Sequence, residues 1–107
     1  MTPYFDGMEG EPAPLTFTCS RCGAAVTRDT WGLVASRPIP DSEVAYFGLV
    51  RFEAMKDFVV TRIRRDGPAA YVVPVSCACG QEHVVALGFG EVQPCRYQAF
   101  LVGVRAA

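Results

Sequence analysis

Four of the five cysteines in this chain fall into two close pairs, and each pair is followed by a glycine. Cys19 and Cys22 are separated by two residues, whereas Cys77 and Cys79 are separated by one. Zinc in structural sites takes four soft ligands in a tetrahedron. A glycine after each pair tolerates the positive φ of a tight turn, and residues two apart on an extended segment leave from one face. The spacing therefore predicts one structural zinc bound by Cys19, Cys22, Cys77 and Cys79.

Other readings of these residues remain open at the sequence level. The four thiols can pack as small hydrophobic groups, and Cys19 and Cys22 can form a thiol–disulfide site. His83, the one histidine, could replace a sulfur as a metal ligand. A lone histidine beside a cysteine pair is more typically a surface group, or a group that contacts the metal ligands without binding the metal. We expect Cys95 to be a buried or half-buried thiol. Its alternative is a reactive thiolate whose pKa is depressed by Arg96.

Composition limits the class of protein. The 107 residues are 50% hydrophobic and 20% charged, with a net charge of -1, which excludes a disordered chain and a generally basic nucleic-acid binder. No apolar run approaches the roughly 18 residues of a membrane span, so we expect no membrane contact. The first residues lack a basic stretch followed by an apolar one, which predicts a cytoplasmic location. The single lysine among many alanine, glycine, arginine and valine residues is typical of a GC-rich bacterial source.

The chain divides into an arm and a domain. Residues 1–14 contain three prolines, two glycines and three carboxylates, and no basic side chain, which predicts a flexible acidic N-terminal arm. Residues 15–107 carry ten basic and eight acidic side chains and predict a single zinc-binding β domain. Between the two cysteine pairs lie 54 residues, too many for a simple finger, so this segment must form a sheet of its own.

Most of the domain alternates between apolar and polar residues with the period of a strand. The predicted strands are residues 15–19, 24–28, 31–36, 42–50, 58–64, 71–77, 83–87 and 97–104. A helix is the alternative for residues 41–56, because Asp41 or Ser42 can cap it and Val44, Phe47, Val50, Phe52 and Met55 come near helical spacing. Residues 51–57 are predicted to form a short turn of helix. The expected fold is mostly β, with small antiparallel sheets pinned by one zinc between two cysteine knuckles, as in zinc ribbons.

Four segments form a further pattern: residues 17–31, Cys77-Ala-Cys79-Gly80, residues 87–90 and residues 96–100. Together they resemble motifs of the β-tent zinc proteins, which include the cereblon-type thalidomide-binding domain and the B-type methionine sulfoxide reductases. The resemblance implies one structural zinc and two antiparallel sheets. It does not extend to either activity: the three-tryptophan cage of the first family has one counterpart here, Trp31. The catalytic cysteine that follows an Arg-Tyr pair in the second is replaced by Gln98.

The arginines are the best candidate for a binding surface. Nine of the ten basic residues are arginine, which suits two-pronged contacts with phosphate or carboxylate. The candidate residues are Arg51, Arg62, Arg64 and Arg65. Their alternative is a solvated strand face that ends at a turn.

These observations predict a small zinc-stabilised binding or regulatory module that acts through protein–protein contact, as a bacterial antagonist or immunity protein does. The second hypothesis is a nucleic-acid-binding zinc ribbon that uses the arginine-bearing hairpin at residues 58–75. The third is a thiol-dependent, reductase-like enzyme that uses Cys95. No phosphate-binding loop, catalytic triad or His-Glu-x-x-His motif is present, so no catalytic residue is predicted.

Overall fold

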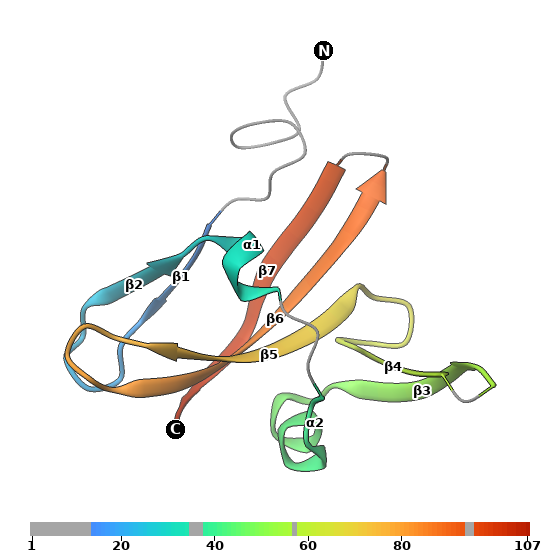
Figure 1. Ribbon diagram of the computed structural model, residues 1–107, viewed down its shortest axis with the longest axis horizontal. Helices are drawn as coiled ribbons and strands as arrows, with labels where there is room; N and C mark the ends of the chain where they lie inside the picture. The colour runs from blue at the N-terminus through green and yellow to red at the C-terminus, as the bar shows by residue number, and fades with distance from the viewer. Residues whose placement is uncertain (1–13, 35–37, 57, 94–95) are drawn as a thin grey trace.

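The computed structural model describes residues 14–34, 38–56, 58–93 and 96–107, and it consists mainly of two antiparallel sheets (Figure 1). The smaller sheet pairs β1 (Leu15–Thr18) with β2 (Ala25–Arg28). The larger sheet has five strands in sequence order: β3 (Val50–Met55), β4 (Phe58–Arg62), β5 (Ala69–Ser76), β6 (Glu82–Gln93) and β7 (Arg96–Ala106). The prediction of a mostly β chain with small antiparallel sheets is confirmed. The predicted acidic arm lies, except for Pro14, outside the described residues.

The main core lies between the two sheets, because alternate residues of β5 and β6 face the small sheet. Val73, Val75, Val85 and Leu87 pack there against apolar side chains of β1 and β2, among them Phe17. Val85 is 1% exposed and Leu87 is fully buried. The same strands run directly into the second cysteine pair, so this core fixes the position of one knuckle relative to the other.

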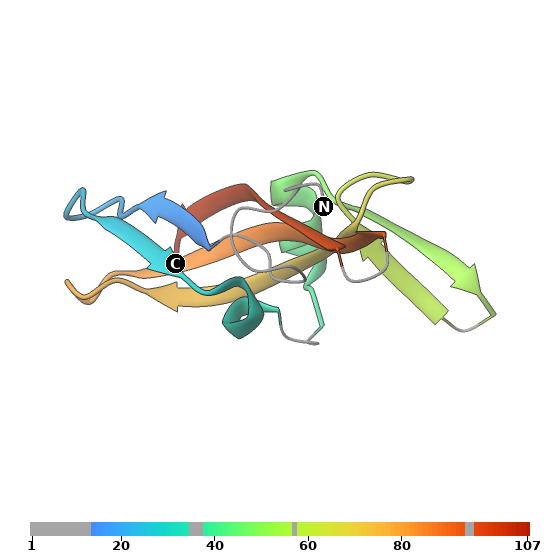
Figure 2. The ribbon, with the colours of Figure 1, turned by 90° about the horizontal axis from the view of Figure 1, so that it is seen from above.

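The opposite face of the large sheet is covered by α2 (Asp41–Phe47). Figure 2 shows α2 and the four-residue α1 (Thr30–Leu33) on opposite sides of the sheet. Phe47 lies against β7 at Gly103, where an added Cβ would come within 3.1 Å of its ring. The absence of a side chain at Gly103 thus allows the helix to approach the strand closely.

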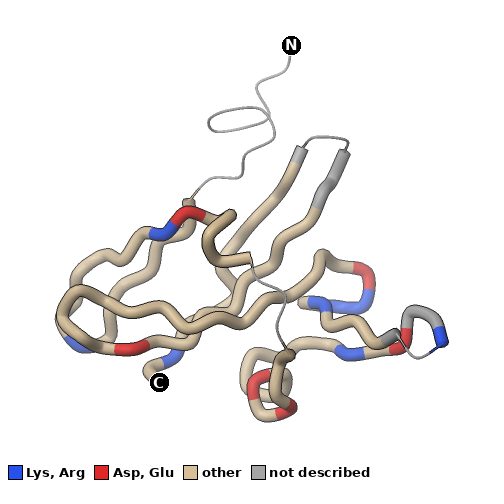
Figure 3. Tube along the Cα trace, viewed as in Figure 1, with Lys and Arg blue, Asp and Glu red and all other residues tan. Residues whose placement is uncertain are grey.

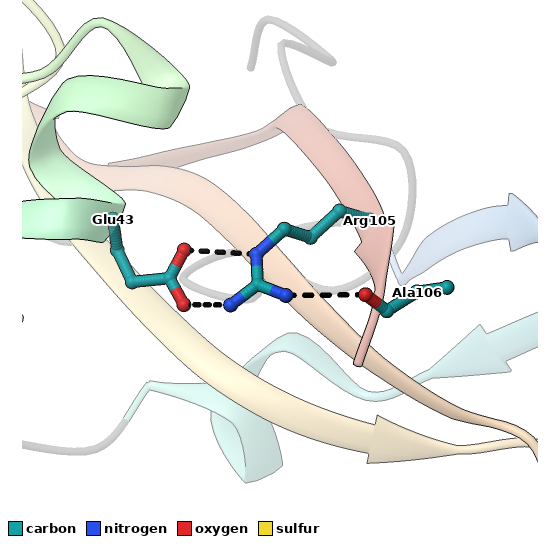
Figure 4. A network of polar contacts seen from close by, with 3 residues as sticks. All are labelled: Glu43, Arg105 and Ala106. Atoms are coloured by element: carbon teal, nitrogen blue, oxygen red, sulfur yellow. Dashed lines mark hydrogen bonds and ion pairs between the residues drawn. The ribbon is translucent and has the colours of Figure 1, made fainter.

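An ion pair joins α2 to the end of β7 (Figure 4). The Arg105 guanidinium donates from Nε to Glu43 Oε1 at 3.0 Å and from a second nitrogen to Glu43 Oε2, so the ion pair is bidentate. The Glu43 hydrogen bond, against the opposing effect of burial, raises the pKa of Arg105. This contact explains why a carboxylate occupies a buried position of the helix.

Three predictions of local structure are wrong. Residues 42–50 form mainly a helix, because Asp41 and Glu43 favour its first turn and Gly48, with φ of 67°, closes its end in the left-handed region. Residues 51–57, predicted as a helical turn, belong largely to β3. The segment that begins at Trp31 is part of α1 rather than a strand.

The predicted hairpin at residues 58–75 is also only partly correct. The strands β4 and β5 are neighbours, but a single residue pair, Arg62 with Ala69, joins them. Instead, β5 pairs along its whole length with β6, from Ala69 to Ser76. The β3–β4 hairpin is therefore attached to the rest of the sheet at one end only, and it lies at the opposite end of the molecule from the two cysteine turns (Figure 1).

Candidate metal centre

Each cysteine pair lies in a tight turn at the end of a strand. In the first turn the Gly23 amide donates to the Cys19 carbonyl at 3.0 Å, and Gly23 has φ of 77°. In the second turn the Gly80 amide donates to the Cys77 carbonyl at 2.9 Å, with φ of 96° at Gly80. An L-residue with a side chain rarely adopts these angles, so glycine is required at both positions. The turn geometry expected from the two motifs is confirmed.

The two turns bring all four sulfurs together. No two of the sulfurs of Cys19, Cys22, Cys77 and Cys79 are more than 4.8 Å apart. Two sulfur contacts cross between the turns: Cys19 Sγ lies 3.7 Å from Cys79 Sγ, and Cys22 Sγ lies 3.6 Å from Cys77 Sγ. A tetrahedron with metal–sulfur bonds of about 2.3 Å has edges of about 3.8 Å. The cluster is therefore compatible with one metal ion at its centre, and the four thiols are not joined in disulfides.

Backbone amides orient the most buried sulfur. The Cys22 and Arg21 amides both donate to Cys19 Sγ, at 3.5 and 3.4 Å. The hydrogen bond from the Cys22 amide is the main reason why the pKa of Cys19 is lowered to about 6. The Arg21 amide and the neighbouring sulfurs lower it further, and burial acts in the opposite direction. At Cys22 the Ala24 amide lowers the pKa, but the other three sulfurs and burial together raise it to about 11. One thiolate is thus readily formed, while a second in the same cluster needs a compensating positive charge, which a metal ion supplies.

No family model, curated protein or solved structure matches this chain. The resemblance to the β-tent zinc proteins therefore stays a prediction. What the cluster can do follows from its own ligands: four thiolates form a closed tetrahedral set, which suits a metal that holds the chain together.

His83 supports the first turn from behind. It is fully buried in β6, and its ring meets Phe17 edge-on at 5.1 Å between centroids. The Ser20 amide donates to His83 Nε2 at 3.3 Å, and the Ser20 hydroxyl lies at the same distance. His83 does not belong to the sulfur cluster, so the alternative in which it replaces a cysteine is not supported. It is not a surface group either; it contacts Ser20, the residue that follows Cys19.

We expect His83→Phe to weaken metal binding about tenfold, a loss typical when groups that orient metal ligands are removed. The substitution keeps an aromatic ring beside Phe17 but leaves the Ser20 amide without its acceptor. Competition with a chromogenic chelator measures the affinity. Ser20→Ala is the matched control, because it removes the hydroxyl and keeps the amide contact. Equal affinities of the wild type and His83→Phe would contradict the supporting role of the ring.

The structure separates the four candidate arginines. Arg51 is paired with Asp41 and also donates to the Ile39 carbonyl, so it fixes the start of α2. The other three lie where β4 passes into β5, a part of the Cα trace with several positions coloured as Lys or Arg in Figure 3. Arg62 pairs with Ala69 at the start of β5, whereas Cys77 follows the end of that strand, so the length of β5 separates these arginines from the second cysteine turn. Cys95, the candidate reactive thiol, lies outside the described residues.

Sequence reasoning missed an aromatic cluster beside α1. The Trp31 ring meets the Phe89 and Tyr97 rings edge-on at 5.2 and 5.3 Å, and Phe89 stacks on Tyr97 at 5.6 Å. Tyr71 joins the cluster through Phe89. Trp31 is 44% exposed. Part of this aromatic cluster could have been located from the sequence. Side chains alternate between the two faces of β5 and β6, which places Tyr71 and Phe89 on the same face as Val73 and Leu87.

Among the described residues, none of the helices is long and apolar enough to cross a membrane. The helices are α1 and α2, of four and seven residues, and both pack on the large sheet. Their role is to cover apolar side chains of the strands.

Proposed function

We propose that this chain is a small binding module whose fold is stabilised by one structural zinc ion, held by Cys19, Cys22, Cys77 and Cys79. The observation that carries the proposal is the convergence of these four sulfurs within 4.8 Å. A tetrahedral set of four thiolates suits zinc or iron, and zinc is the usual choice where no redox chemistry is needed. Because four protein ligands leave no open coordination position, the metal would stabilise the fold and take no part in catalysis.

Elemental analysis of the native protein tests this part of the proposal. Purification without chelators should give one zinc per chain, and iron would be visible from its colour. Absence of any metal, or iron in place of zinc, would refute the assignment. A disulfide between Cys19 and Cys22 in protein prepared under nitrogen would support the thiol–disulfide alternative instead.

The contact with a partner protein is assigned to the aromatic cluster of Trp31, Tyr71, Phe89 and Tyr97. Tryptophan and tyrosine are enriched at the energetic centres of protein interfaces. Trp31 is one of few large apolar side chains described as exposed, and its ring is held by two others, so little rotational freedom would be lost on binding. The surface would take an apolar segment of the partner.

Quantitative affinity capture from an extract of the source cells, compared between the wild type and Trp31→Ser, tests the surface. We expect at least one protein to be captured by the wild type and reduced about tenfold with Trp31→Ser, as for an interface hot spot. Tyr46→Ser is the matched control, because Tyr46 is 63% exposed and lies on α2, across the sheet. Equal capture by all three proteins would exclude the aromatic cluster as the partner site.

A further inference from the structure

Two of the four candidate arginines have acidic partners among the described residues. Arg51 is paired with Asp41, and Arg64 Nε lies 3.4 Å from Asp66 Oδ1. For Arg62 and Arg65 the structure describes no carboxylate partner. The two guanidinium carbons instead lie over one ring, that of Phe52, at 5.4 and 5.6 Å from its centroid.

This arrangement holds two positive charges near one aromatic ring. The negative face of an aromatic ring attracts a guanidinium, so Phe52 restricts the orientations of both side chains. Restricted side chains lose less entropy when they bind a ligand. The mutual repulsion of the two guanidiniums is relieved when an anion binds beside them.

The surrounding hairpin is basic as well. Residues 50–69 contain five basic and three acidic side chains, in a chain whose net charge is -1. Arg65 is exposed, and Arg62 and Phe52 are half-buried, so an extended ligand can reach all three. The β3–β4 hairpin and the two cysteine turns lie at opposite ends of the molecule, so this surface lies away from the sulfur cluster (Figure 1).

We propose that Arg62 and Arg65, supported by Phe52, bind the phosphate backbone of single-stranded nucleic acid. The arginine fork matches a phosphate, and the guanidinium plane also stacks on unpaired bases. An acidic peptide offers carboxylates but no planar bases, so the same two side chains would bind it less well. This site goes beyond the proposed zinc-stabilised protein-binding module and uses none of its residues.

Fluorescence anisotropy with a labelled 20-nucleotide oligothymidylate, measured on the zinc-loaded full chain between 50 and 200 mM KCl, tests the proposal. Each phosphate contact of a single strand contributes about 0.7 to the slope of log affinity against log salt. Arg62→Ala/Arg65→Ala should therefore reduce the slope by about 1.4 and the affinity at 50 mM KCl at least tenfold. Arg28→Ala/Arg64→Ala is the matched control, since it removes the same charge and should change the affinity less than about threefold.

Three results would overturn the proposal: no binding by the wild type at 50 mM KCl, equal losses in both double variants, or competition by polyglutamate as effective as that by oligothymidylate. The last result would identify a site for acidic proteins.

If the alanine variant does not fold, Arg62→Lys/Arg65→Lys replaces it. That variant keeps both charges and loses the planar groups. The salt slope should therefore persist, while the affinity should fall about fivefold, which is the lower end of the loss caused by removing one stacked base. Unchanged affinity there would also exclude the planar contact.

Discussion

Replacing Cys77 with serine is expected to release the proposed zinc ion and to unfold most of the chain. Cys77 is 7% exposed and follows β5, and its sulfur lies 3.6 Å from that of Cys22 in the other turn. Structural zinc contributes about 10–16 kcal/mol of apparent binding free energy in zinc-finger peptides, whereas a whole domain is stable by about 5–15 kcal/mol. Loss of the ion thus removes an amount comparable with the total. Elemental analysis should fall from one zinc per chain to near zero, and far-ultraviolet circular dichroism should lose its cooperative thermal transition.

Cys95→Ser is the control for this experiment, because Cys95 is the one cysteine that the assignment leaves out of the ligand set. The variant should keep one zinc and the wild-type melting temperature. Treatment of the wild type with a strong chelator should reproduce the behaviour of Cys77→Ser. A Cys77→Ser protein that retains stoichiometric zinc and its thermal transition would contradict the four-cysteine assignment, as would zinc loss in Cys95→Ser.

The cysteine turns could be predicted because their determinants are local. A ligand pair and the glycine that closes the turn lie within five residues, and the sulfurs of both turns then meet within 4.8 Å. The strands that lead into and out of the turns were predicted for the same reason, since alternation along four or more residues determines which face is buried. Chemistry that lies within one turn of the chain is therefore readable from this sequence.

The helix α2 could not be predicted because some of its residues favour a helix and others favour a strand. Gly48 disfavours the interior of a helix, and the aromatic and β-branched residues around it favour a strand. In the structure it is the left-handed residue that ends the helix, and its amide bonds to the Ala45 and Val44 carbonyls. The tertiary contacts that decide between these readings, Glu43 with Arg105 and Phe47 with Gly103, come from a strand more than fifty residues later.

A comparable distance along the chain explains why the aromatic cluster was missed. Trp31 meets Phe89 and Tyr97 only because α1 is folded onto the far strands of the large sheet. The four arginines are alike in the sequence, and only their partners separate them: Arg64 has Asp66, whereas Arg62 has the Phe52 ring. Which charged groups remain available to a ligand is a property of the fold.

Leu87→Ala is expected to destabilise the protein while leaving the zinc in place. Leu87 is fully buried in the core between the two sheets, and it pairs with Leu101 of β7. Removing most of a buried leucine side chain costs about 2–5 kcal/mol, because the lost burial is added to the cost of the cavity that remains. With a urea dependence of about 1–3 kcal/mol per molar, the midpoint of unfolding should fall by roughly 1–2 M.

The comparison between this variant and Cys77→Ser separates the contribution of the core from that of the metal. Leu87 is not a ligand and lies four residues beyond His83, so native Leu87→Ala should still contain one zinc per chain. Val59→Ala is the control, because Val59 is 57% exposed and its truncation should shift the midpoint little. If Leu87→Ala lost its zinc under native conditions, the two sheets would depend on each other for the position of the sulfurs, and the metal could not hold them together alone. If its midpoint were unchanged, the core between the sheets would contribute little, and the zinc ion would be the main source of stability.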